Sequence, residues 1–278
     1  MRFKPLLIPL AVAGCAGLAA QSAVAGPSGY PIQAAPVFNG ALMIRVGAAY
    51  VEPDSSALST VQRFSVDDPT IEDDNPIPVD VGVKLDLDND TTWYLSAVYM
   101  PMEHWGIELY HYNSASHDAK LFSNAYTRST FIGDFREDIG DFDSYTTSLL
   151  ANWYPLGANC LIQPYVGLGV AYVDIEEDFL RPVFRDGPAN RHGLITVGSD
   201  FSWTAQIGVD FNFGPGSAWQ VNASAMYVDA SPHINLGFDT DTLPPGFGAP
   251  VTLPVRVRDD FDLDPWMFNL GIGYKFSF

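Results

Sequence analysis

A histidine and a serine close together in the sequence are the first candidates for chemistry. His111 and Ser114 are three residues apart, and a serine beside a histidine base can act as a nucleophile, for example on a lipid ester. Nothing around Ser114 matches the G-x-S-x-G elbow that exposes such a nucleophile. We therefore interpret His111 as an interfacial residue and Ser114 as a loop residue, and we predict no catalytic residues.

A run of spaced carboxylates is the second candidate. The stretch DLDND at 86–90 places Asp86, Asp88 and Asp90 at the first ligand spacings of a calcium loop. The glycine that should follow is missing, and Ala97 occupies the place of the closing glutamate. None of the histidines forms a metal-ligand pair on a helix. We predict no cofactor and no specific metal site, while weak binding of divalent cations by acidic loops stays open.

Four charged residues occupy the polar positions of otherwise apolar, alternating segments. These are Arg45, Glu108, Asp210 and Lys275. Two are positive and two are negative, so they can neutralise one another in one narrow space, and buried charges are tolerated only when paired. One interpretation is a structural plug that blocks water and ions. The other is a selectivity element in a pore that runs from end to end.

The segments that hold these residues alternate with a period of two. In FSWTAQIGVDFNF (201–213) every odd position is apolar and every even position is small or polar, as in a half-buried β-strand. The pattern occurs near 42–52, 91–100, 104–112, 144–154, 163–173, 201–213, 218–228 and 264–278. Each stretch has about the ~9–11 residues that a tilted strand needs to cross a bilayer. The sequence therefore predicts an all-β, eight-stranded antiparallel barrel.

The connections between these stretches alternate between short and long. The short ones cover 101–104, 155–162 and 214–217 and are rich in turn-forming residues. The long ones cover about 52–90, 113–143, 174–200 and 229–263 and hold most of the acidic residues. Short periplasmic turns and long extracellular loops are typical of a transmembrane barrel of the bacterial outer membrane.

The six tryptophans indicate which face of the barrel meets lipid. All lie on the apolar face near strand ends. We expect an outer ring of Trp93, Trp203 and Trp266 and an inner ring of Trp105, Trp153 and Trp219. Two aromatic girdles around an aliphatic band suit a lipid-facing surface. The alternative is a soluble barrel with its apolar face inside, which predicts no sorting of aromatic residues into rings.

The two ends of the chain agree with export to the outer membrane. Residues 1–25 have a positive start, an apolar stretch and the A-x-A site Ala23-Val24-Ala25, so we interpret them as a signal peptide. Residues 26–40 then form a periplasmic tail, and 41–278 form the barrel. A terminal Phe278 on the apolar face resembles the signal read by the barrel-assembly machinery. The formal charge of −19 argues against nucleic acid as a partner.

Six phrases in this sequence resemble the OmpW family of outer-membrane proteins. They are RVGAAYVEPDSS (45–56), WGIELYHYNSASHD (105–118), PYVGLGVAYV (164–173), WTAQIGVDF (203–211), WQVNASAMYVD (219–229) and DPWMFNLGIGYKF (264–276). The resemblance implies an eight-stranded barrel whose hydrophobic channel admits small apolar molecules from outside and releases them sideways into the membrane. This chain departs from the family in its long acidic first loop, with a hairpin extension expected at 79–90, and in SYTTSLL at the fourth strand.

Phenylalanines in the long connections favour passive uptake of small hydrophobic molecules. We expect a vestibule lined by Phe131, Phe135, Phe142, Phe179, Phe184 and Phe238, since grouped apolar residues on exposed loops mark binding sites. The expected partners are outer-membrane lipids, lipopolysaccharide and the hydrophobic solutes themselves. Two alternatives remain: a structural or adhesive barrel that presents acidic loops, and a lipid-modifying barrel enzyme.

Overall fold

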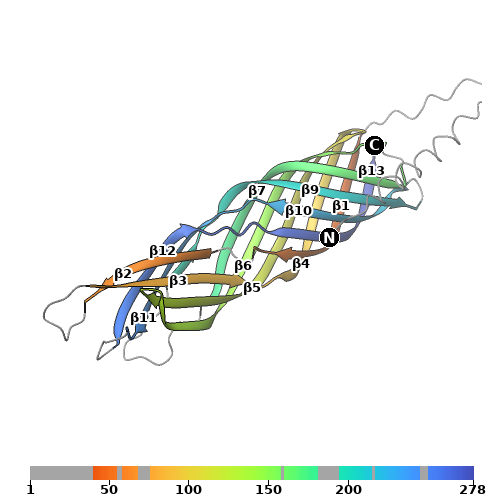
Figure 1. Ribbon diagram of the computed structural model, residues 1–278. Helices are drawn as coiled ribbons and strands as arrows, with labels where there is room; N and C mark the ends of the chain where they lie inside the picture. Colours follow the sequence, from red (N-terminus) through yellow and green to blue (C-terminus); the bar gives the residue numbers. More distant parts are fainter. Residues whose placement is uncertain are drawn as a thin grey trace, which may run out of the picture.

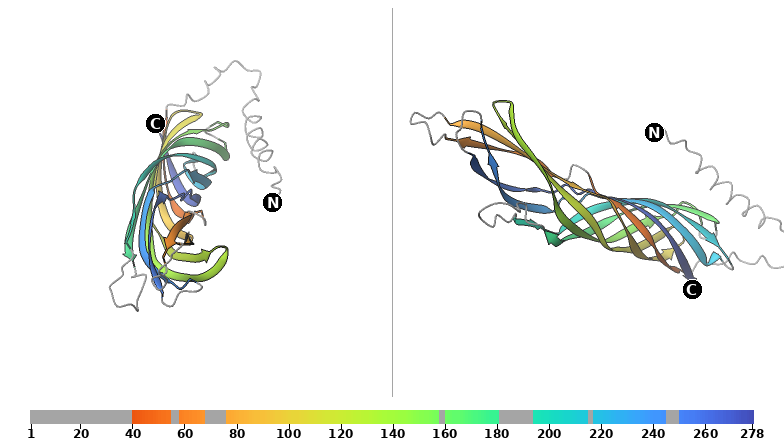
Figure 2. Two further views of the ribbon diagram at one scale, coloured as in Figure 1. Left: turned by 60° about the vertical axis from the view of Figure 1, so that its left-hand side comes forward. Right: turned by 90° about the horizontal axis from the view of Figure 1, so that it is seen from below.

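The computed structural model describes residues 40–54, 58–67, 76–157, 160–180, 194–214, 217–244 and 250–278 (Figure 1). The predicted signal peptide (1–25) and nearly all of the predicted tail (26–40) lie outside the described residues. Within the described part of the chain, no helix is long and apolar enough to cross a membrane. The described elements are strands, and they form one elongated body (Figure 2).

Eight strands form a closed antiparallel ring, which confirms the predicted fold class. They are β1 (Ala41–Glu52), β4 (Asp90–Met102), β5 (Trp105–Thr127), β6 (Thr130–Trp153), β7 (Ile162–Leu180), β9 (Asp200–Phe213), β10 (Trp219–Val228) and β13 (Trp266–Ser277). Each pairs with the next in this order, and β1 pairs with β13 from Ala41↔Ser277 to Glu52↔Trp266. The ring therefore has no free edge.

The long connections contain more strand than the sequence predicted. Strands β5, β6 and β7 continue well past the barrel, and five further strands join them: β2 (Leu58–Val66), β3 (Ile77–Leu87), β8 (Leu194–Val197), β11 (His233–Thr242) and β12 (Val251–Asp260). The expected hairpin at 79–90 is part of this arrangement, since β3 pairs with both β2 and β5. The long connection at 113–143 is a single hairpin of β5 and β6 that turns at Arg128-Ser129.

These strands, with the outer parts of β5, β6 and β7, continue the barrel wall on the extracellular side. We call this part the extracellular extension. One part of it continues the main sheet through β2, β3, β5 and β6, and the other is a separate sheet in the order β12-β11-β8. The views in Figure 1 and Figure 2 show both parts at the end of the molecule opposite the C-terminus.

The interior of the molecule changes character along its axis. The extracellular part is filled by one buried apolar cluster, here called the apolar column, which includes Ala49, Leu85, Tyr112, Phe142, Phe238 and Val255. At the periplasmic end lies a small cluster of Ala41, Met43, Val98, Met100, Tyr154 and Tyr165. The buried Arg45 lies beside this second cluster, where it contacts Tyr154 and Tyr165.

Candidate functional site

Arg45 is the centre of the polar layer inside the barrel. Its Nη2 donates to Asp210 Oδ2 at 2.6 Å, and its Nη1 donates to Glu108 Oε1 at 3.2 Å. The three residues come from β1, β9 and β5, and all are at most 2% exposed. Each sits at a polar position of an alternating strand, so the pleat turns it inward. The structure thus brings together three of the four charges singled out in the sequence.

The fourth charged residue, Lys275, lies on β13. It is buried on β13 opposite Met43, nearer the periplasmic end than Arg45. It interacts with Asp210 through space. The ion pairs of Arg45 with Glu108 and Asp210 form the centre of the charged layer, and Lys275 lies nearby on β13.

Neutral residues complete this layer, and the sequence analysis did not single them out. Asn152 and Gln206 each donate to Glu108 Oε2, at 2.6 and 2.7 Å. Asn222 donates to Asp210 Oδ1 at 2.8 Å, and Arg45 donates to the Tyr154 hydroxyl at 3.1 Å. We call this set, with Arg45, Glu108 and Asp210, the lumen network. The alternation of the sequence shows that the side chains of these neutral residues point inward. It does not show which of them contact one another.

Two tyrosine rings fill the space that inward-facing glycines leave. A Cβ on Gly208 would come within 2.4 Å of the Tyr165 ring, and a Cβ on Gly271 within 2.4 Å of the Tyr94 hydroxyl. The Arg45 guanidinium lies 5.2 Å from the Tyr165 ring centre, where it gains a cation–π contact. The small residues of the polar face therefore accommodate large rings from neighbouring strands, and the lumen is packed at this level.

Of the phenylalanines of the expected vestibule, the structure describes the side chains of Phe131, Phe142 and Phe238. Phe142 and Phe238 are buried in the apolar column, each 2% exposed. Phe131 is exposed at the tip of the β5–β6 hairpin, where its ring contacts Tyr126 at 5.7 Å. The structure describes only the backbone of Phe135 and Phe179, on β6 and β7, and Phe184 lies outside the described residues.

The six tryptophans lie on the outward face of the barrel, and each is about half exposed. Trp105 and Trp153 are direct cross-strand neighbours at the periplasmic end. At the other end, Tyr227 contacts both Trp203 and Trp266, with ring centres 5.5 and 5.3 Å apart. Large aliphatic residues between the two levels are also exposed, as Ile207 and Leu270 show at 62% each.

The structure shows the surroundings of the histidine–serine pair, His111 and Ser114, and of the acidic residues that could bind a metal. His111 Nδ1 lies 2.9 Å from Thr147 Oγ1, and no described contact joins it to Ser114. A different Ser–His contact exists between His117 Nε2 and Ser144 Oγ at 2.9 Å, but both residues are 1% exposed. A substrate cannot reach a nucleophile buried in this way. Among the described residues, no group of three His, Cys, Asp or Glu side chains could hold a metal ion.

Comparison with known proteins decides the family. A model of the OmpW family matches residues 38–276, which is nearly the whole barrel. The chain belongs to the OmpW family. Outer membrane protein W of Escherichia coli is 28% identical over 246 residues, covering 85% of this chain and 89% of that protein. The Salmonella typhimurium protein of the same name is 26% identical over 239 residues, with the same coverage.

A solved structure has a similar fold. The crystal structure of the outer membrane protein OprG from Pseudomonas aeruginosa superposes with a TM-score of 0.58 at 22% identity. The match covers 87% of this chain and 98% of that one. Family and fold together place this OmpW-family protein in the bacterial outer membrane, as the loop pattern predicted. Its relatives are named as outer-membrane proteins and not as enzymes.

Proposed function

We propose that this OmpW-family barrel is a passive channel for small hydrophobic molecules. The observation that carries the proposal is the apolar column, which runs through the extracellular extension down to the lumen network. An apolar solute that enters such an interior exchanges water for apolar contacts, at about 25 cal/mol per Å² of buried surface. An ion or a sugar that enters the same interior loses its hydration without receiving partners.

The lumen network supports the next step, because it closes the axis below the column. Arg45, Glu108 and Asp210 are already bonded to one another and to amide side chains. A hydrophobic solute gains no contact from passing them, and separating them would leave buried charges unpaired. We propose that the network acts as a plug and that solutes leave sideways, through the wall of the barrel.

The strand pairing of the wall is irregular beside Asn113 and Ser114 of β5, where side chains of β4 bridge the gap: Thr92 Oγ1 donates to the Asn113 carbonyl and Asp90 accepts from the Ser116 amide. On one side, the ladder with β4 ends at Tyr94↔Tyr112; on the other, the register with β6 shifts between Tyr112 and Ala115. Ser114 has a positive φ of 38°, which is unusual for a residue with a side chain. Because Trp93 lies next to Tyr94, this point is close to the outer aromatic ring. We propose it as the exit into the outer leaflet.

The wall is continuous at two other positions where glycine or proline could weaken it. The glycine-rich stretch 164–169 pairs without interruption with β9 and, from Val166 onward, with β6. Beside Pro265, the wall continues through hydrogen bonds from Val228 N to Pro265 O and from Asp54 N to Leu263 O. Neither glycine content nor a proline therefore weakens the wall at these points.

A purely structural barrel is the second candidate, and the packing of the interior favours it. Residues of the apolar column such as Leu85 and Val255 are 0% exposed, so the column is closed to water in this structure. Uptake then requires the column to open transiently, whereas a structural barrel requires nothing more. An adhesive role for the acidic surface also belongs to this candidate.

Uptake measurements separate the two candidates. Cells that express the protein should accumulate a hydrophobic fluorescent probe faster than a knockout, at a rate linear in probe concentration, with no change for a hydrophilic sugar of similar size. Ala119→Phe adds bulk to the column and should slow uptake, while Ser65→Phe on the exposed face of β2 should not. Equal probe uptake with and without the protein would leave the structural barrel as the better account.

A further inference from the structure

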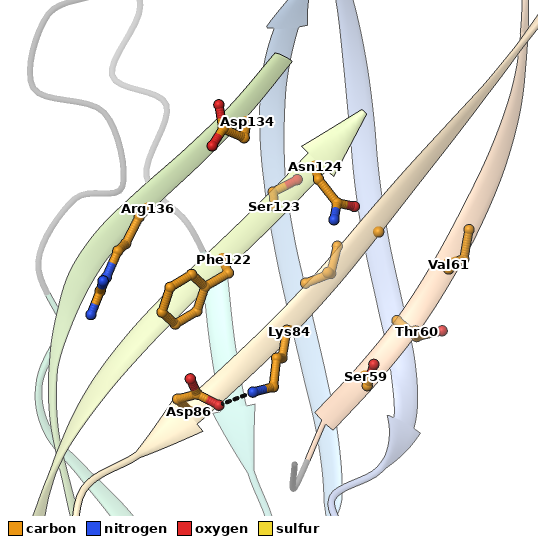
Figure 3. A pocket seen from close by; sticks show the side chains of 12 residues that line it. Ser59, Thr60, Val61, Lys84, Asp86, Phe122, Ser123, Asn124, Asp134 and Arg136 are labelled. Atoms are coloured by element: carbon orange, nitrogen blue, oxygen red, sulfur yellow. Dashed lines mark ion pairs between the residues drawn. The ribbon is translucent and has the colours of Figure 1, made fainter. Parts of the chain in front are cut away.

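An open groove of about 580 Å³ lies on the outward face of the extracellular extension (Figure 3). It crosses strands β2, β3, β5 and β6. On β3, the groove residues Gly82, Lys84 and Asp86 alternate with Val81 and Leu85, which are buried in the apolar column. The groove therefore opens away from the interior and is separate from the proposed solute path.

Strand register builds the groove as two rows across the sheet. The first row is Ser59, Lys84, Phe122 and Arg136, and the second is Val61, Gly82, Asn124 and Asp134. Gly82 has no side chain, and the amide of Asn124 occupies the space above it. A Cβ there would come within 2.2 Å of Asn124 Oδ1, so the amide of Asn124 lies directly over the glycine.

The two cations of the first row, Lys84 and Arg136, already have partners. Lys84 pairs with Asp86 at 2.6 Å, and the guanidinium of Arg136 lies 4.7 Å from the Phe122 ring centre. Figure 3 shows these side chains on the same face as Asp134. Two cations and two carboxylates leave the groove without a net charge, which disfavours a polyanion as its ligand.

The second row adds polar groups without partners. Among the residues that the structure describes, the side chains of Asn124 and Asp134 take part in no hydrogen bond or ion pair. An amide offers two donors and an acceptor, a carboxylate accepts, and the Ser59 hydroxyl does both. This combination next to an aromatic ring matches a ligand with many hydroxyl groups and apolar C–H faces, which is the surface of a sugar.

The position of the groove above the membrane surface indicates where such a sugar comes from. Phe122 lies ten residues beyond Tyr112 on β5, or about 30 Å of strand above the outer aromatic ring. The outer leaflet of a bacterial outer membrane is lipopolysaccharide, whose oligosaccharide projects through this level. The outward face of an extracellular wall is therefore surrounded by sugar chains.

We propose that the groove binds a neutral segment of the lipopolysaccharide oligosaccharide. Its volume lies within the range of about 300–1,000 Å³ of small-ligand sites. Asn124, Asp134 and Ser59 bond to sugar hydroxyls, and the side of the Phe122–Arg136 pair contacts a sugar ring. Such contacts would anchor the extension among the sugar chains independently of solute transport.

Calorimetric titration of the folded protein in detergent tests this proposal. The first probe is delipidated oligosaccharide from full-length lipopolysaccharide, and the second is the same preparation from a strain that makes only the innermost sugars. We expect the first to bind and the second not to bind. Asn124→Ala and Asp134→Ala should each weaken binding about tenfold, because each removes hydrogen bonds to the sugar.

The matched control is Asn235→Ala, which removes an exposed amide from β11 on the other sheet of the extension. It should bind the oligosaccharide like the unmodified protein. Gly82→Val, whose side chain would displace the Asn124 amide from its place over the glycine, should abolish binding while the barrel still folds. The proposal is overturned if the full-length oligosaccharide does not bind, if the truncated one binds equally well, or if the groove variants keep the original affinity.

Discussion

The side-chain amide of Gln62 pairs with both main-chain groups of Arg256, 194 residues further along the chain. Its Nε2 donates to the carbonyl oxygen of Arg256, and its Oε1 accepts from the Arg256 amide at 3.0 Å. No strand ladder joins β2 to β12 among the described residues. One amide side chain therefore substitutes for a ladder at the point where the two sheets of the extension meet.

Removing this amide should loosen the extension and leave the barrel intact. In Gln62→Ala the amide of Arg256 loses its partner, so its hydrogen exchange should accelerate by about tenfold or more. Exchange in β1 and β13 should not change. Ser65→Ala, on the same strand, serves as the control, and unchanged exchange at Arg256 in the Gln62 variant would contradict this account.

Asp210→Asn should destabilise the barrel, because it leaves Arg45 with only one carboxylate in a buried site. Removing a partner from a buried ion pair costs about 3–5 kcal/mol. Urea-induced unfolding in detergent or lipid vesicles measures the change. The surface pair of Arg63 and Asp80 provides the comparison, since Asp80→Asn should cost less than about 1 kcal/mol. Equal effects of the two changes would argue against the lumen network as a stabilising unit.

Acid should weaken the extension through His117, which lies beyond the outer aromatic ring. Burial lowers the pKa of His117, while a hydrogen bond to Asp88 and the charges of Asp90 and Asp143 act in the opposite direction. The unfolded chain, with a histidine pKa of about 6.5, therefore takes up the proton first as pH falls. The stabilising contribution of neutral His117 is complete above about pH 6.5 and is lost progressively below it.

Thermal unfolding at pH 7.5 and pH 5 checks this dependence. The melting temperature of the unmodified protein should fall more between these values than that of His117→Gln, which cannot gain the proton. His233→Gln changes an exposed histidine on β11 whose Nδ1 lies 2.5 Å from Asp260 Oδ1; because exposed pairs contribute little to stability, this variant should retain most of the difference. A His117→Gln variant with the original pH dependence would refute the assignment.

A charged residue on the outward face of β9 should lower the folding stability of the barrel. Ile207 is 62% exposed midway along this strand, so Ile207→Arg places a cation near the middle of the bilayer. The expected loss in folding free energy is about 2–4 kcal/mol. Ile207→Leu should be nearly neutral. Refolding titrations in lipid vesicles measure both, and equal stability of the two variants would show that this face does not meet lipid.

The sequence predicted the barrel well and the extension poorly, for a physical reason. Barrel strands such as 201–213 alternate sharply, because one face meets lipid and the other a narrow interior. In the continuation of β5, the inward positions Ala115, His117 and Ala119 are small or polar, and the outward positions face water. Hydrophobic alternation is then too weak to mark a strand, although the backbone still pairs.

The candidate site was only partly predictable from the sequence. The alternation of side chains along each strand predicted that Arg45, Glu108 and Asp210 point inward. Their opposite charges indicated that they share one space. Parity gives the face of a strand but not the reach of a side chain across the lumen. The contact of Tyr165 with the space above Gly208 depends on the stagger of strands around the ring, which a single sequence does not contain.

The lumen network also has a consequence for how the strands find their alignment. A slip of β1 by one residue relative to its neighbours would move Arg45 to the lipid face and bring Ile44 or Val46 toward Asp210. The ladder hydrogen bonds would survive such a slip, because the backbone repeats, but two carboxylates would lose their cation. The ion pairs therefore favour the observed alignment of β1 over one shifted by a single residue, which would leave buried carboxylates without a cation.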